Sequence, residues 1–127
     1  MNFINNSEVI TSGDLVVFGG IVAKSPDNIL LFPFDVAKQT LWIIDHIKLI
    51  LENIGLGLDH LIMVTVYLPD QKHYCEMNKA YTMLMPSPLP PRKVIFTPLT
   101  VEGAVVEFTA MASIHGKHIV RYKELNG

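Results

Sequence analysis

The feature that most restricts the fold is a helix-type stretch followed directly by a strand-type stretch. Across residues 40–54, branched apolar residues recur at spacings of three and four, the period of one buried helical face. Asp35 is placed to cap the start of this helix, and Gly55 and Gly57 mark its end. The run 61–68 is continuously apolar and rich in branched residues, which predicts a buried strand.

The rest of the chain predicts strands at both ends and a second helix. Gly19-Gly20 interrupts the strand-type run 15–22, which predicts a bulge or a close approach of another group. The other expected elements are a short extended run before the turn 12–14, either a short strand or an extended segment at 29–32, a helix at 71–85 capped by Asp70, and strands at about 93–98 and 104–114 joined as a hairpin. The expected order is β-β-(β)-α-β-α-β-β: an α+β fold with one mixed sheet and two helices on one face.

Length and composition predict a single domain, residues 1–127, that associates with copies of itself. Half of the residues are hydrophobic and 17% are charged, and the mean hydropathy is +0.34. A membrane span is not expected, because Asp45, His46 and Lys48 interrupt the apolar stretch that comes nearest to one. Two helices leave one sheet face uncovered, so we expect sheets of several subunits to meet around a symmetry axis.

Charge and residue counts argue against several classes of partner. The net charge is −2 with no run of Lys or Arg, so no nucleic-acid partner is expected. The single cysteine, Cys75, excludes an internal disulfide, and the five histidines form no metal set by their spacing. Residues 1–6 lack a basic region followed by an apolar core, so we expect no signal peptide and a cytoplasmic location.

One arginine stands at the mouth of a predicted strand. Pro90 and Pro91 precede Arg92 and restrict its backbone, which reduces the freedom lost on binding. A guanidinium is a planar fork that binds a carboxylate through two parallel hydrogen bonds. An isolated arginine is more commonly an ordinary surface charge, so the pattern alone leaves both interpretations open.

A carboxylate, Glu107, interrupts the apolar run 104–112. With Thr109 it could face water, as on a sheet with one solvated face. Against this, Val105 and Met111 share its nominal face. A carboxylate in partly apolar surroundings can act as a general base or acid near neutral pH.

Two further features have an ordinary structural interpretation on sequence grounds. Gly19-Gly20 lacks the spacing of a nucleotide-binding loop, although its backbone groups could face a ligand. Asn78, in the second predicted helix, is typical of a helix-surface amide.

Most of the chain, from about residue 13 to 112, resembles the reactive intermediate deaminase family (RidA, also called YjgF). The matching segments are Gly13-Asp14-Leu15-Val16-Val17 before a glycine pair, Ile54-Gly55, 61–68 with Pro69-Asp70, Met77-Asn78-Lys79-Ala80-Tyr81, Pro90-Pro91-Arg92, and Val106-Glu107-Phe108-Thr109-Ala110-Met111-Ala112.

This resemblance implies a chorismate-mutase-like homotrimer with a barrel-like sheet core and sites in the clefts between subunits. It implies hydrolysis of enamine or imine acids to 2-oxo acids and ammonia without metal or organic cofactor. Carried over by position, Arg92 would bind the substrate carboxylate and Glu107 would position the water. The backbone at Gly20 and Val94 would line the pocket, with Asn78 nearby.

The chain departs from the family pattern at four positions. Asn6 stands where the family has a tyrosine, Gly19 replaces a serine, Ile21 a glutamine and Val94 a cysteine. These changes imply a different or bulkier substrate. Two alternatives stay open at this point: a 2-aminomuconate-type deaminase of aromatic-ring degradation, and a non-catalytic trimer that binds small carboxylates.

Overall fold

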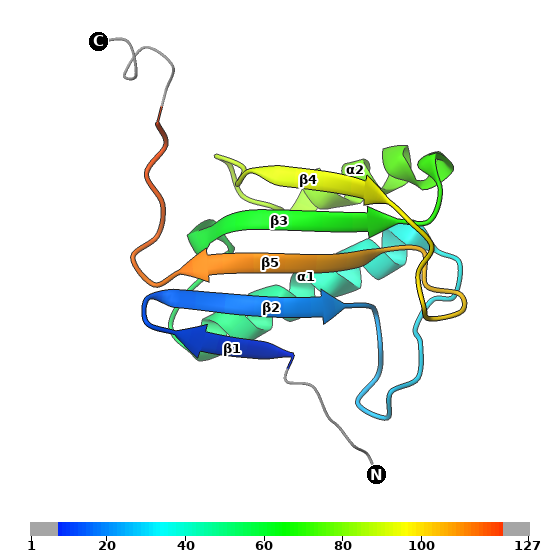
Figure 1. The fold of residues 1–127 in the computed structure, drawn as a ribbon, viewed down its shortest axis with the longest axis horizontal. Coiled ribbons are helices and arrows are strands. Elements are labelled where there is room, and N and C mark those ends of the chain that lie inside the picture. Colours follow the sequence, from blue (N-terminus) through cyan, green and yellow to red (C-terminus); the bar gives the residue numbers. More distant parts are fainter. Residues whose placement is uncertain (1–7, 121–127) are drawn as a thin grey trace.

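A five-stranded sheet with two helices behind it makes up the body of the molecule (Figure 1). The computed structural model describes residues 8–120; Asn6 and the rest of residues 1–7 lie outside this range. The elements are β1 (Val9–Ser12), β2 (Leu15–Ile21), α1 (Val36–Asn53), β3 (Leu61–Leu68), α2 (Tyr74–Leu84), β4 (Arg92–Phe96) and β5 (Glu107–Ser113). The strand order is β1-β2-β5-β3-β4. Only the β3–β4 pair among these is parallel. The expected mixed sheet with both helices on one face is confirmed.

Helix α1 begins and ends at the predicted signals. The Asp35 carboxylate accepts a hydrogen bond from the backbone N–H of Lys38 at 3.0 Å, so it satisfies a donor of the first turn. Gly55 has a φ of 81°, the left-handed conformation that ends many helices. The apolar stripe of α1 is buried as expected, except for Ile50, which is partly buried, and Ile54, which follows the last helical residue and is 46% exposed.

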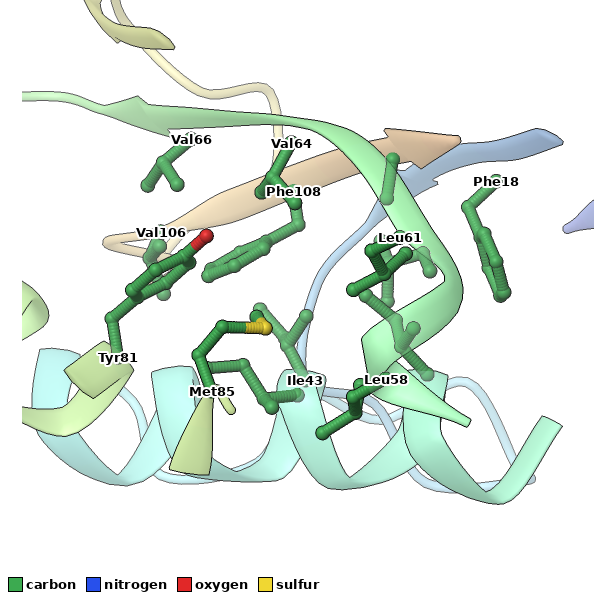
Figure 2. Close-up of a cluster of buried hydrophobic side chains, with 14 of the residues drawn as sticks. Phe18, Ile43, Leu58, Leu61, Val64, Val66, Tyr81, Met85, Val106 and Phe108 are labelled. Atoms are coloured by element: carbon green, nitrogen blue, oxygen red, sulfur yellow. The ribbon is translucent and has the colours of Figure 1, made fainter. Parts of the chain in front are cut away.

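The core lies between the helices and one face of the sheet (Figure 2). Val64 and Val66 of β3 and Phe108 of β5 point from the sheet toward Ile43 of α1 and Tyr81 of α2. The rings of Tyr81 and Phe108 stack with centroids 6.1 Å apart. Burial of each such side chain stabilises the fold by about 1.5–3 kcal/mol, so this layer fixes α2 over β3, β4 and β5.

Two sequence expectations about strands are wrong. Residues 29–32 form no strand; Leu30 makes a single bridge with Lys24. Asn28 and Phe32 have φ values of 66° and 49°, which break an extended backbone. The expected hairpin of the last two strands is also absent, because β3 lies between β4 and β5.

The missing hairpin has a topological cause. The unit β3–α2–β4 is a parallel crossover, which carries the chain over the sheet and sets β4 down on the outer side of β3. Strand β5 then enters on the other side of β3, between β3 and β2. The second helix also starts later than expected. Asp70 caps the 3₁₀ turn Gln71–His73 through the N–H of Lys72 at 2.9 Å, and α2 follows this turn.

A buried amide joins two loops at the entrance to β5. Gln39 of α1 is 0% exposed. Its Nε2 donates to the carbonyl of Phe32 at 2.9 Å and to that of Gly103 at 3.1 Å, while its Oε1 accepts from the N–H of Val105 at 2.9 Å. Val105 is therefore buried just before β5 rather than part of the Glu107 face, which corrects the expectation from strict alternation. Gln39 fixes where β5 begins.

We expect Gln39→Leu to lower the free energy of unfolding by about 2–4 kcal/mol, since the apolar side chain leaves buried backbone groups without partners. Urea denaturation followed by circular dichroism measures this. Gln71→Leu, the same change at an exposed position, is the control and should shift stability by less than about 0.5 kcal/mol. Equal effects of the two changes would contradict a stabilising role for the Gln39 hydrogen bonds.

The sheet face away from the helices carries apolar side chains with no layer over them in the described residues. Ile10, Leu15 and Met63 are 53%, 36% and 36% exposed, and the strand register places all three on this face. A contiguous apolar sheet face is typical of a surface that another chain covers. No helix within residues 8–120 has the length and apolar character that crossing a bilayer requires.

Candidate functional site

Side chains of α2 hold the Arg92 side chain in one orientation, and we call these contacts the Arg92 seat. Its Nη1 donates to Oδ1 of Asn78 at 2.8 Å, and its Nη2 donates to the hydroxyl of Tyr74 at 3.2 Å. The guanidinium carbon lies 4.6 Å from the centre of the Tyr81 ring, a cation–π contact. A guanidinium has five N–H donors, so donors remain for a ligand after these two bonds. Arg92 is thus an oriented, partly buried cation with N–H donors left over, which makes it a candidate for binding an anion.

The Tyr81 hydroxyl beneath Arg92 is buried and finds no hydrogen-bond partner among the described residues. Burial raises the pKa of Tyr81 to about 12, against a smaller lowering by the nearby Arg92 charge. Tyr81 therefore stays neutral at physiological pH and supports Arg92 through its ring face.

Tyr81→Phe is expected to leave stability at pH 7 unchanged or higher by up to about 1 kcal/mol, because an unpartnered hydroxyl is removed. In alkali the wild type should lose more stability than the variant. The phenol ionises near pH 10 when unfolded but near 12 when folded, so its contribution is present below pH 10 and is lost as pH rises to 12. Urea denaturation of both proteins at pH 7, 9.5 and 11.5 measures the difference. A variant less stable by more than about 1 kcal/mol at pH 7 would show that the hydroxyl has a partner.

Glu107 lies beside the backbone of Gly20. A Cβ built on Gly20 would overlap Oε2 of Glu107 and lie 3.2 Å from its Cδ. The register of β2 and β5 is shifted between Phe18 and Ile21, so the glycine pair forms the predicted irregularity. The glycine pair thus provides the space that the Glu107 carboxylate occupies.

Gly20→Ala should displace Glu107 without unfolding the protein, because the added methyl group meets the far end of one side chain. We expect any activity that depends on Glu107 to fall by about tenfold or more, since small misplacements of catalytic groups are costly. Steady-state kinetics and a thermal melt of the same sample separate the two effects. Full activity with an unchanged melt would argue against a role for the Glu107 position.

Arg92 and Glu107 do not meet within one chain. Arg92 pairs with Val64 of β3, whereas Glu107 pairs with Tyr67 on the other side of β3. Strand spacings place their Cα atoms roughly 14 Å apart. Arg92 also lies on the helix side with buried Val64, and Glu107 alternates with buried Phe108, so it lies on the open face. The two charges that the sequence singled out therefore occupy opposite sheet faces.

The backbone of Val94 faces the free edge of the sheet. The carbonyl of Pro91 and the N–H of Thr97 both bond to β3. Alternation along β4 then points the N–H and C=O of Val94 away from β3, toward the edge where no other described strand pairs. The Val94 side chain packs against the core. Of the residues that the sequence singled out, Arg92, Asn78 and the Val94 edge therefore lie together, and Gly20 and Glu107 lie together at a second place.

Sequence reasoning missed two of the partners of Arg92. Tyr74, Asn78 and Tyr81 lie at positions i, i+4 and i+7 of the second helix, which is the spacing of one helical face. This stripe was a usable signal for a polar and aromatic seat. No group of three metal-ligating side chains occurs within residues 8–120, and Cys75 is exposed on α2.

The fold, with two helices packed on one face of a mixed five-stranded sheet, matches that of several solved structures. Among solved structures, RidA from the Antarctic bacterium Psychrobacter sp. PAMC 21119 aligns with a TM-score of 0.79 at 23% identity, covering 90% of this chain and 92% of that one. A YjgF family member from Neisseria meningitidis aligns with a TM-score of 0.75 at 23% identity, covering 85% and 86%.

The chain belongs to the family described as Endoribonuclease L-PSP, whose model matches residues 4–114. A RutC family protein of Pyrococcus abyssi is 28% identical over 84% of each chain. Protein HMF1 of Saccharomyces cerevisiae is 26% identical over 84% of this chain and 82% of its own length. These relatives and the RidA and YjgF structures confirm the RidA/YjgF-like family that the sequence motifs indicated.

Proposed function

We propose that this protein hydrolyses imine or enamine acids to 2-oxo acids and ammonia. The observation that carries the proposal is the Arg92 seat. Asn78 and Tyr74 orient the guanidinium and Tyr81 backs it, while donors remain free for a substrate carboxylate. Membership of a family that includes RidA-type proteins supports the same reaction class.

The chemistry needs few groups, because the carbon of a C=N bond is already electrophilic. Arg92 would hold the carboxylate next to that carbon. Glu107 would accept a proton from a water molecule as its oxygen attacks the carbon, and the nitrogen would take up protons. Cleavage of the C–N bond in the resulting carbinolamine then releases ammonia and leaves a 2-oxo acid. The atoms of one imine and one water are all accounted for, with no cofactor in the scheme.

A complete site on this scheme needs two copies of the chain. Arg92 and Glu107 lie on opposite sheet faces of one subunit, so Arg92 of one copy would act with Glu107 of another. The uncovered apolar sheet face supports such an assembly. We propose a cyclic homotrimer whose open sheet faces meet around the axis, with small carboxylates as ligands at the clefts between subunits.

A coupled assay tests the function directly. Threonine dehydratase produces an enamine acid that hydrolyses slowly to 2-oxobutanoate, and the purified protein should accelerate release of both 2-oxobutanoate and ammonia. Heat-denatured protein is the control. If the protein does not accelerate release but binds 2-oxobutanoate saturably in calorimetry, the proposed enzyme function is wrong and the non-catalytic carboxylate-binding trimer is supported. Acceleration confined to 2-aminomuconate would select that substrate instead.

The family description names an endoribonuclease, which makes RNA cleavage a second candidate. Incubation of a labelled single-stranded RNA with the protein and with an Arg92→Ala variant tests it. Cleavage by the wild type and not by the variant would overturn imine hydrolysis as the main activity of this site.

A further inference from the structure

A cleft of about 980 Å³ lies beside the Glu107 half of the site. Gly20 and Ile21 line it from the end of β2, and Trp42 and His46 line it from α1. Gly20 is also the residue whose backbone adjoins the Glu107 carboxylate. Glu107 lies on the open face of the sheet and the rings of α1 lie behind the other face. The cleft and the carboxylate meet at Gly20, on the stretch of β2 past Phe18 that β1 leaves unpaired.

One wall of the cleft is a pair of stacked rings. The centroids of Trp42 and His46 are 4.6 Å apart, with 19° between the ring planes. Nε2 of His46 lies 2.5 Å from Oε1 of Glu8, the residue before β1. This contact ties the imidazole to the sheet. The ring pair is thus a fixed aromatic surface, which a planar group can pack against by stacking or edge-to-face contact.

The cleft is larger than a four-carbon acid can fill. Its volume lies in the range of sites that enclose drug-sized ligands. Next to Trp42 the walls include the apolar Ile21 and Val22, and Lys24 supplies a positive charge that makes no ion pair among residues 8–120. The lining also includes the Glu8 carboxylate, which His46 contacts, and the polar Ser25 and Asn28. The apolar residues and aromatic rings around Trp42 suit a ring-bearing substituent better than a short alkyl chain.

We propose that this cleft is the side-chain pocket of the site and that it selects 2-imino and 2-oxo acids carrying a planar ring. The proposal rests on the function proposed above. With the reacting carbon at Glu107, the substituent of the acid passes around the edge of β2 at Gly20, where β1 no longer covers it, and its ring lies against Trp42 and His46.

Binding can be measured without turnover, because Trp42 is the chain's one tryptophan. The probes are 3-phenylpropanoate and butanoate, two carboxylates that differ by a phenyl ring, with excitation where neither absorbs. We expect 3-phenylpropanoate to change Trp42 emission saturably at a concentration at least tenfold below any effect of butanoate. His46→Ala should weaken the effect. Equal responses to the two acids would overturn the ring-selective cleft.

Turnover gives a second and independent readout. Imino acids are generated from phenylalanine and from 2-aminobutanoate by an amino acid oxidase. The wild type should prefer the phenylalanine-derived imine. Trp42→Ala should reduce that preference about tenfold, and Trp42→Phe should keep it within about threefold because the ring is retained. Leu49→Ala, an exposed change on the same helix, is the control.

The two proposals fail in different ways. If neither imine is turned over but Trp42 emission still responds selectively to 3-phenylpropanoate, the cleft is a ring-binding pocket and the proposed deaminase function is wrong. If both imines are turned over equally by the wild type and by Trp42→Ala, the deaminase function is supported and the ring-selective cleft is contradicted. Circular dichroism of each variant shows that the fold is retained.

Discussion

Arg92→Ala is expected to raise the concentration of imine acid needed for half-maximal rate by about 30–150-fold. This range corresponds to about 2–3 kcal/mol, the contribution of charge-assisted hydrogen bonds to a carboxylate. The guanidinium is already oriented by Asn78 and Tyr74, so binding requires little further ordering of the side chain. Kinetics of the coupled assay and calorimetric titration with 2-oxobutanoate measure the loss.

Two variants make the Arg92 result specific. Arg92→Lys keeps the charge but loses the planar fork, so it should recover only part of the affinity. Lys79→Ala removes an exposed cation from the same helix and should leave affinity unchanged. If Arg92→Ala binds and turns over substrate as the wild type does, Arg92 is not the carboxylate clamp.

Glu107→Gln is expected to lower kcat by about 10²- to 10⁴-fold, because the amide cannot accept the proton of the attacking water. The affinity for 2-oxo acids should change little, since the carboxylate clamp is intact. This separation of kcat from binding distinguishes a catalytic base from a group that only shapes the pocket. Stopped-flow assays with pre-formed imine measure kcat, and calorimetric titration measures the affinity for 2-oxo acids.

Glu102→Gln is the matched control for Glu107→Gln, because it makes the same chemical change at an exposed turn residue. It should leave both kcat and affinity as in the wild type. Loss of 2-oxo acid affinity in Glu107→Gln with an unchanged kcat would assign Glu107 to binding and contradict its role as the base.

Local patterns predicted the elements of this fold well. The stripe of α1, its Asp35 cap and the Gly55 stop were all readable from the sequence, since helix period and capping are local properties. The glycine pair correctly indicated an irregularity in β2. The expected strand at 29–32 failed because positive φ angles, held by tertiary contacts such as those of Gln39, have no reliable signal in a single sequence.

Non-local relations were harder to predict. The crossover that puts β3 between β4 and β5 depends on long-range pairing, so a hairpin was the natural but incorrect expectation. The same relation determines the faces of Arg92 and Glu107. The sequence assigned both to one site, which the family resemblance placed between subunits, but it did not show that they lie on opposite sheet faces of one chain. The seat of Arg92 became visible only once α2 was known to pack beside β4.

The central claim is that Arg92 of one subunit acts with Glu107 of another, and mixed assemblies test it most directly. Arg92→Ala and Glu107→Gln subunits are unfolded together, refolded at equal amounts and assayed at an imine concentration well below that for half-maximal rate, where each variant alone is expected to be nearly inactive. Random assembly restores the intact pair at about a quarter of the sites, so about a quarter of wild-type deaminase activity should return. Activity that stays at the level of the separate variants, in mixed trimers confirmed by native mass spectrometry, would contradict a site shared between subunits.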